Sequence, residues 1–179
     1  MNQSSVMTRQ FWCGVAAVAV VIIVAAAAPA LAKSFGGSLK LDPIGALATG
    51  PCSATYANIC PSTTCVCQQY QGKLSGHFGG RSGAGSAQLS LTVDDGLATS
   101  SPDGCRPIFG VATISTPIGG ATINLTGAFC DEIGKSTQQK IQGGFGLAGG
   151  SFGEGLGTFN GNLNNTSDKL TISFSGQTQ

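Results

Sequence analysis

The sequence GGFGLAGGSFGEGLGTFNG, residues 143–161, is dense in glycine. Each glycine inside a helix costs roughly 1 kcal/mol relative to alanine, so we expect no helix here. Side chains of a strand alternate between its two faces, and Gly153, Gly155 and Gly157 therefore leave one face bare. A bare face permits a tight bend, a bulge, or the close approach of another backbone or a large side chain. The obvious large neighbours are Phe145, Phe152 and Phe159.

Short strands separated by turns are predicted along the rest of the chain. Residues 86–93 show the clearest pattern, with apolar and polar side chains at alternate positions. Further strands are expected at 33–41, 69–78, 138–145, 153–163 and 170–176, with two more inside 105–130. Asp42 and Pro43 are expected to end the first strand, and the glycine cluster at 79–85 to form a turn. This spacing predicts an all-β protein, an antiparallel barrel of about eight strands, with a β-sandwich as the alternative.

The N-terminus has the pattern of a signal peptide. Arg9 precedes an uncharged apolar run at 11–28, and the residues that follow end in Ala-Leu-Ala at Ala32. A run of about 18 apolar residues is at the lower limit for an uncleaved membrane anchor, but Pro29 and the small residues after it favour cleavage before Lys33. We therefore predict export to the periplasm or the extracellular space, with no stable membrane anchor after cleavage.

The predicted organisation has three parts. Residues 1–32 form the signal peptide, residues 33–67 an N-terminal segment with a cysteine-rich loop, and residues 68–179 the β-barrel domain. Removing Arg9 with the leader leaves eight of the nine basic residues against eight acidic ones, so the mature chain is neutral. A neutral, charge-poor surface lacks the electrostatic footprint of a nucleic-acid-binding protein, and we expect no nucleic-acid partner.

Six cysteines follow the predicted cleavage point, and an even number in an exported chain predicts up to three disulfides. They are Cys52, Cys60, Cys65, Cys67, Cys105 and Cys130. The four cysteines between residues 52 and 67 could in principle bind zinc as thiolates. The usual Cys-x2-Cys spacing is absent and an oxidising compartment favours disulfides, so we predict no metal and no cofactor.

One disulfide pairing follows from the predicted hairpin at 105–130. If residues 115 and 120 pair across the turn at 116–120, antiparallel register keeps the sum of each pair at 235. That register places Cys105 opposite Cys130. The short Cα separation between paired residues suits a disulfide, which would close the open end of the hairpin.

The glycine spacing of the opening stretch resembles that of the GGTGRFAGASGSG-type segment of exported bacterial β proteins of unknown function. The matching glycines are Gly143, Gly144, Gly146, Gly150, Gly153 and Gly155. A related segment occurs in dirigent proteins and allene oxide cyclases, so the resemblance, which covers roughly 60–176, implies an eight-stranded barrel. Phe145, Leu147 and Ala148 replace the threonine, arginine and phenylalanine of the family-like segment. Loss of that arginine removes one candidate ligand-contacting charge, and no catalytic residue is carried over.

The sequence contains few candidate catalytic residues. His77 is the only histidine, and its position near a predicted strand end is typical of a surface residue. Glu154, flanked by glycines, is a site candidate if it points into the barrel beside Arg81 or Arg106, and a solubilising residue if it points outward. The carboxylate pairs at 94–95 and 131–132 fall at predicted turns, where calcium binding is an alternative to local hydrogen bonding.

The leading hypothesis is a non-enzymatic exported barrel that binds a small apolar ligand or has a structural role in the envelope. Barrels of about eight strands are either filled by side chains or hold one small ligand. The predicted ligand-binding residues are Phe145, Phe152, Glu154 and Phe159. The alternatives are a stereo-directing protein or enzyme similar to dirigent proteins and allene oxide cyclases, and an adhesion or self-assembly protein that uses sheet edges.

Overall fold

A computed structural model of the protein describes residues 32–49, 65–96, 104–131 and 137–179. Its strands are β1 (Lys33–Thr49), β2 (Cys65–Phe78), β3 (Arg81–Asp94), β4 (Cys105–Thr116), β5 (Gly119–Asp131), β6 (Gln138–Gly150), β7 (Gly155–Asn164) and β8 (Lys169–Thr178). The predicted signal peptide up to residue 31 lies outside the described residues, as do Cys52 and Cys60.

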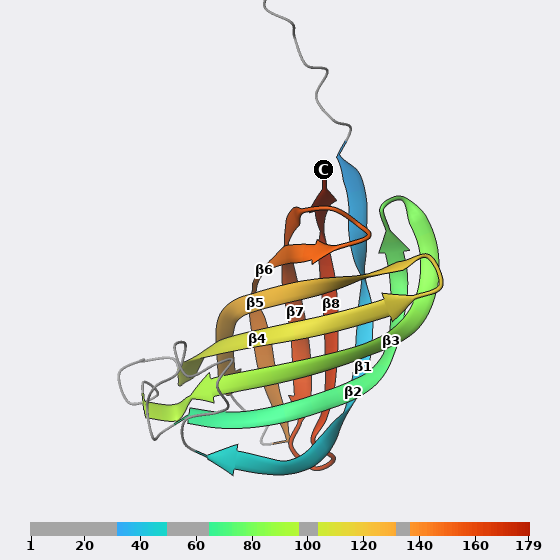
Figure 1. The fold of residues 1–179 in the computed structure, drawn as a ribbon. Helices are drawn as coiled ribbons and strands as arrows, with labels where there is room; N and C mark the ends of the chain where they lie inside the picture. Colours follow the sequence, from blue (N-terminus) through green and yellow to red (C-terminus); the bar gives the residue numbers. More distant parts are fainter. Residues whose placement is uncertain (1–31, 50–64, 97–103, 132–136) are drawn as a thin grey trace, which may run out of the picture.

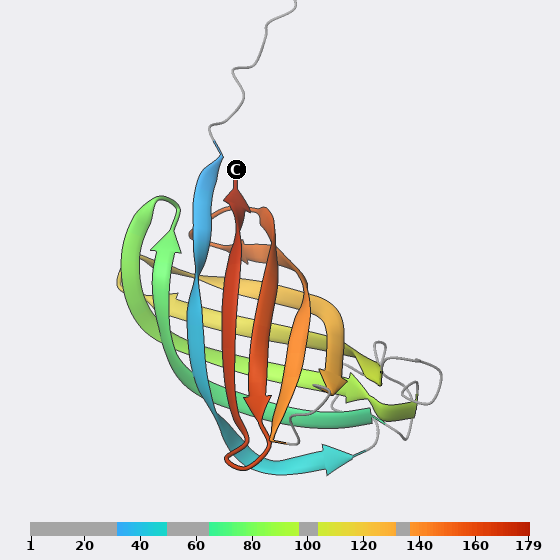
Figure 2. The same ribbon diagram turned by 180° about the vertical axis from the view of Figure 1, so that it is seen from behind.

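The eight strands form one closed antiparallel barrel in which sequence neighbours are also spatial neighbours (Figure 1, Figure 2). β1 closes the barrel by pairing with β8, from Lys33 opposite Thr178 to Leu41 opposite Leu170. The predicted all-β antiparallel barrel is therefore confirmed, and the sandwich alternative is excluded.

The barrel has two chemically different ends. We call one end the mouth; there Lys33 and Gln179 lie beside the turns at 79–80, 117–118 and 151–154. We call the opposite end the base; it carries the turn at 165–168 and the strand ends Thr49, Cys65, Asp94, Cys105, Asp131 and Gln138.

Side chains alternate between the interior and the outer wall along the strands. In β8, Leu170, Ile172 and Phe174 are buried, whereas Thr171 and the other intervening residues are exposed. The same alternation holds for residues 86–91 in β3, as the sequence predicts, but Thr92 is buried and donates to the Cys67 sulfur, and Val93 is only half-buried. All eight strands contribute to one contiguous hydrophobic cluster, so the interior of the barrel is a packed core.

The glycine-dense stretch folds into β6, β7 and the turn between them, and its glycines make room for large side chains. Phe145 lies opposite Gly157, and Phe159 lies opposite Gly143. A Cβ atom added at Gly157 would meet the Ser175 carbonyl oxygen and lie 2.5 Å from the Phe145 ring. On the bare strand face predicted from the sequence, the absence of a side chain at Gly157 therefore leaves room for an aromatic ring from the neighbouring strand.

The barrel begins upstream of the predicted boundary at residue 68. β1 does not end at Asp42 and Pro43 as expected, but continues to Thr49 with a register shift between Ile44 and Ala48. Pairing with β8 stops at Leu41, so Pro43 lies in a segment that pairs with β2 alone. A sheet tolerates proline in such an edge segment because one side of the strand needs no N–H donor.

The glycine cluster at 79–85 is a second correction. Only Gly79 and Gly80, both with positive φ, form the turn, and β3 starts at Arg81. A Cβ atom at Gly85 would collide with the Ser115 carbonyl oxygen of β4. Gly85 therefore does not form a turn; it allows β3 and β4 to approach closely.

The hairpin of β4 and β5 has the predicted register and the predicted disulfide. Ser115 pairs with Gly120, and Cys105 pairs with Cys130. A disulfide joins these two cysteines, whose Cα atoms are 4.0 Å apart. Cys65 and Cys67 are also disulfide-bonded, and they lie in β2 instead of the predicted loop.

Candidate ligand site at the barrel mouth

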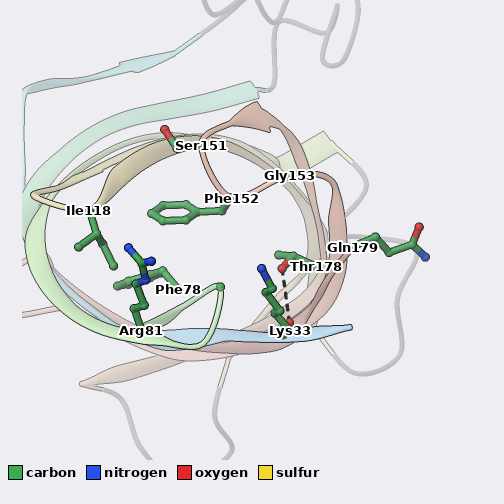
Figure 3. A pocket seen from close by; sticks show the side chains of 10 residues that line it. Lys33, Phe78, Arg81, Ile118, Ser151, Phe152, Gly153, Thr178 and Gln179 are labelled. Carbon is green, nitrogen blue, oxygen red and sulfur yellow. Dashed lines mark hydrogen bonds between the residues drawn. The ribbon is translucent and has the colours of Figure 1, made fainter. Parts of the chain in front are cut away.

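A pocket of about 380 Å³ opens at the mouth. Its walls come from the start of β1, the β2–β3, β4–β5 and β6–β7 turns, and the end of β8 (Figure 3). Pockets for small ligands typically span about 300–1,000 Å³, so this one has room for a compact molecule.

Aromatic rings form the floor of the mouth pocket. The ring centroid of Phe152 lies 5.5 Å from that of Phe78 and 6.0 Å from that of Phe35. Phe35 continues the cluster inward, with centroid distances of 6.0 Å to Phe145 and 5.6 Å to Phe174. These separations are typical of favourable aromatic pairs. The pocket therefore rests on a continuous apolar surface that extends into the core.

Phe152 reaches into the mouth from the β6–β7 turn, where the ring lies across the opening (Figure 3). The turn is attached to β5 by a hydrogen bond from the Ser151 amide to the Gly120 carbonyl oxygen, at 2.8 Å. Glycines with positive φ flank the phenylalanine: Gly149 at 140°, Gly150 at 120° and Gly153 at 80°. The glycine-dense sequence thus has a second role, because it allows the chain to fold back and place Phe152 over the barrel.

Two cationic side chains line the same pocket. Lys33 comes from β1 and Arg81 from β3, and both point into the ring of strands (Figure 3). Among the ion pairs and hydrogen bonds of the described residues, none engages the Arg81 guanidinium or the Lys33 ammonium group. Among the described residues, no acidic side chain lines the pocket. The mouth therefore combines an apolar floor with unneutralised positive charge.

The four predicted ligand-binding residues do not come together. Phe145 and Phe159 are buried, at 4% and 3% relative exposure, and belong to the core. Glu154 is exposed and does not line the mouth pocket, which corresponds to the outward orientation considered for it. Phe152 alone of the four lines the mouth pocket, and Phe145 supports its floor from below.

The remaining polar candidates lie outside the mouth pocket. His77 is exposed on the outer wall of β2. Asp95 and Asp131 of the two carboxylate pairs both bind Arg106, and Glu132 lies outside the described residues. No group of three or more histidine, cysteine or acidic residues that could hold a metal ion is present in the described part of the chain.

Arg106 organises the base of the barrel. It donates to Asp95 at 3.0 Å and to Asp131 at 3.1 Å, and its guanidinium carbon lies 4.9 Å from the centre of the Phe129 ring. Gln139 also donates to Asp131, at 2.7 Å. These residues, apart from Asp131, line a smaller pocket of about 180 Å³. The cationic group at this end is thus already occupied by protein acceptors.

Tyr70 also lines the pocket at the base, where only 4% of it is exposed. Burial raises the pKa of the Tyr70 hydroxyl to about 12, and the negative charge of Asp168 adds to the increase. Both effects disfavour the phenolate, so this hydroxyl is neutral at physiological pH.

Comparisons with known protein families, with curated protein sequences and with solved structures gave no match. Within the described ranges, no helix is long and apolar enough to cross a membrane.

Local sequence patterns do not bring Lys33 and Arg81 into one site. Lys33 precedes the first apolar residue of β1, and Arg81 falls in the predicted turn at 79–85. Their shared location depends on closure of the barrel, which brings β1, β3 and the turn at 151–154 to one opening. The alternation of β3 was the available signal: Arg81 has the same parity as the buried residues Ala87, Leu89 and Leu91.

Proposed function

We propose that the protein is an exported, disulfide-bonded barrel that binds one small ligand with an apolar surface at its mouth, without catalysing a reaction. The mouth pocket carries this proposal, because the partly exposed ring of Phe152 in its floor continues the buried aromatic core. Binding at the mouth suits a barrel whose interior is already filled by side chains. The disulfide-bonded Cys65, Cys67, Cys105 and Cys130 support export, since disulfides persist in oxidising compartments.

The other candidate functions have less support. A stereo-directing enzyme would need a cavity lined by Phe145, Phe152 or Phe159 together with an inward Glu154. Phe152 does line the mouth pocket, but Glu154 is exposed and lies outside it. Adhesion through sheet edges is weakened by the pairing of β1 with β8, because closure removes edges. A structural role in the envelope stays as the alternative if no ligand binds.

The first test of ligand binding is native mass spectrometry of the protein purified from an exporting host. We expect a population heavier than the mature chain by the mass of one small molecule, which is lost on denaturation. A Phe152→Trp variant provides a second readout, because Trp12 in the predicted leader is the only tryptophan of the sequence. Ligand at the mouth should change the fluorescence of this tryptophan.

The matched control is Leu47→Trp, which places the reporter on an exposed residue near the base. Its fluorescence should not respond to the ligand. If neither the mass nor the Phe152→Trp emission reveals a bound molecule from the host or from a panel of small apolar compounds, the proposal fails. The structural role would then be the better account.

A further inference from the structure

The charged side chains at the mouth bear on which ligand chemistry the pocket would accept. Lys33 and Arg81 line the pocket, whereas Glu154, in the turn beside it, is exposed and lines a separate pocket together with Leu156. A neutral apolar ligand would leave two positive charges next to its surface without a counter-charge. An anionic ligand would supply that counter-charge, and it would be attracted to the opening before contact is made.

Arg81 has the chemistry needed for a planar anion. A guanidinium group presents a fork of N–H donors that matches the two oxygens of a carboxylate, and such bidentate pairs are shorter and stronger than neutral hydrogen bonds. In the described residues no protein acceptor uses the donors of Arg81. Arg106 at the base shows the contrasting case, with two carboxylates of the protein already bound.

The apolar contacts lie beside the cation and not at a separate place. Phe152, Ile118 and Phe78 line the same pocket as Arg81 (Figure 3). A ligand whose anionic group meets Arg81 therefore has its body over aromatic and aliphatic carbon. One pocket of about 380 Å³ can therefore contact both the anionic group and the apolar body of such a ligand.

We propose that the ligand class of the mouth is a small carboxylate with a compact aromatic or aliphatic body, held by Arg81 with help from Lys33 and by the partly exposed Phe152 and Ile118. This inference rests on the proposed function, since it names the chemistry of the molecule bound at that site. Arg81 is the specificity-determining residue: it distinguishes an anion from a neutral molecule of the same shape.

The test compares 2-naphthoate with its neutral isostere 2-naphthamide, using the Phe152→Trp protein and isothermal titration of the unsubstituted protein. We expect naphthoate to bind more tightly than naphthamide. Arg81→Gln should lower the affinity for naphthoate by about tenfold to a hundredfold, which is the range of a charge-assisted hydrogen bond. The affinity for naphthamide should not change. Added salt should weaken the binding of naphthoate but not that of naphthamide, because the cationic side chains are exposed to solvent.

The matched control is Lys73→Gln, which removes a positive charge from the outer wall of β2. It should leave the affinity of both compounds unchanged, and circular dichroism should show that each variant keeps its fold. Equal or tighter binding of naphthamide, or an Arg81→Gln effect no larger than that of Lys73→Gln, overturns the anion proposal while the proposed ligand-binding function stands. If neither compound binds and the protein carries no molecule from the host, both proposals fail.

Discussion

Two arginines at opposite ends of the barrel have opposite surroundings. At the base, Arg106 donates to Asp95 and Asp131 and lies over the Phe129 ring. At the mouth, Arg81 points into an opening where the described residues offer it no acceptor. The base is also cross-linked by the Cys105–Cys130 disulfide, whereas short turns and the ring of Phe152 line the opening at the mouth.

The contrast separates the groups that hold the fold from the groups available to a ligand. Polar groups at the base are satisfied by other protein groups, so they contribute to stability and specificity of the fold. At the mouth the fold is held by packing of aromatic rings against bare glycine backbone, which leaves the charged groups unoccupied. The following variants test this division, beginning with the largest expected effect.

The packing beneath the mouth should be the most sensitive to substitution. Gly157→Ala introduces a methyl group that collides with the Ser175 carbonyl oxygen and the Phe145 ring. We expect a loss of about 3 kcal/mol in the free energy of unfolding, because overpacking forces both strands apart. Denaturant unfolding followed by circular dichroism measures this loss.

Gly146→Ala is the matched control on the neighbouring strand. Its Cβ atom would lie 3.6 Å from a Leu156 methyl carbon, an ordinary contact. It should change stability by less than about 1 kcal/mol. Equal losses in the two variants would contradict the packing account.

Removal of the disulfide tests the cross-link at the base. The paired cysteines are 25 residues apart in sequence, and the double variant Cys105→Ser/Cys130→Ser should lose about 3 kcal/mol of stability. Binding at the mouth should be unaffected at temperatures where the variant is folded. A parallel loss of 2-naphthoate binding in the folded variant would show that the two ends are not independent.

The two arginines provide a direct comparison of stability. Arg106→Gln leaves Asp95 and Asp131 without their cation, and we expect a loss of about 1–2 kcal/mol because both carboxylates are partly exposed. Arg81→Gln should change the free energy of unfolding by less than about 0.5 kcal/mol. A larger effect for Arg81→Gln would mean that the mouth cation stabilises the fold.

Tyr70 at the base predicts an effect on the free energy of unfolding that is confined to alkaline pH. Its pKa in the folded protein is about 12, against about 10 in the unfolded chain. Between these values the folded state binds more protons, so stability is fully present below about pH 10 and falls as the pH rises toward 12. Tyr56 is the other tyrosine of the sequence, so in a Tyr56→Phe variant the absorbance of the phenolate reports Tyr70 alone; it should titrate near 12 when folded and near 10 when denatured. A folded titration near 10 would contradict the buried environment.

Local patterns predicted most of the barrel. Alternation placed the side chains of β3 and β8 on the correct faces, and antiparallel register alone placed Cys105 opposite Cys130. Both are properties of one strand or one hairpin, which the sequence contains in full. Glycine was harder to interpret, because the same residue makes a turn at Gly79 and permits close strand contact at Gly85.

The composition of the site could not be predicted in the same way. Phe145, Phe152 and Phe159 are equally conspicuous in the sequence, but two of them face glycines inside the wall and one reaches over the opening. Lys33 and Arg81 join Phe152 only because β1 pairs with β8 and completes the ring. That closure is a long-range property, so a search for local motifs does not find the pocket.

The most direct test of the division between the ends is amide chemical-shift mapping by NMR with 2-naphthoate. We predict that shift changes gather at 78–81, 118–120, 151–153 and 178–179, around the mouth pocket. Amides at 105–107 and 129–131, around Arg106, should not move. Changes centred on the base would contradict the assignment of binding to the mouth and of structural support to the base.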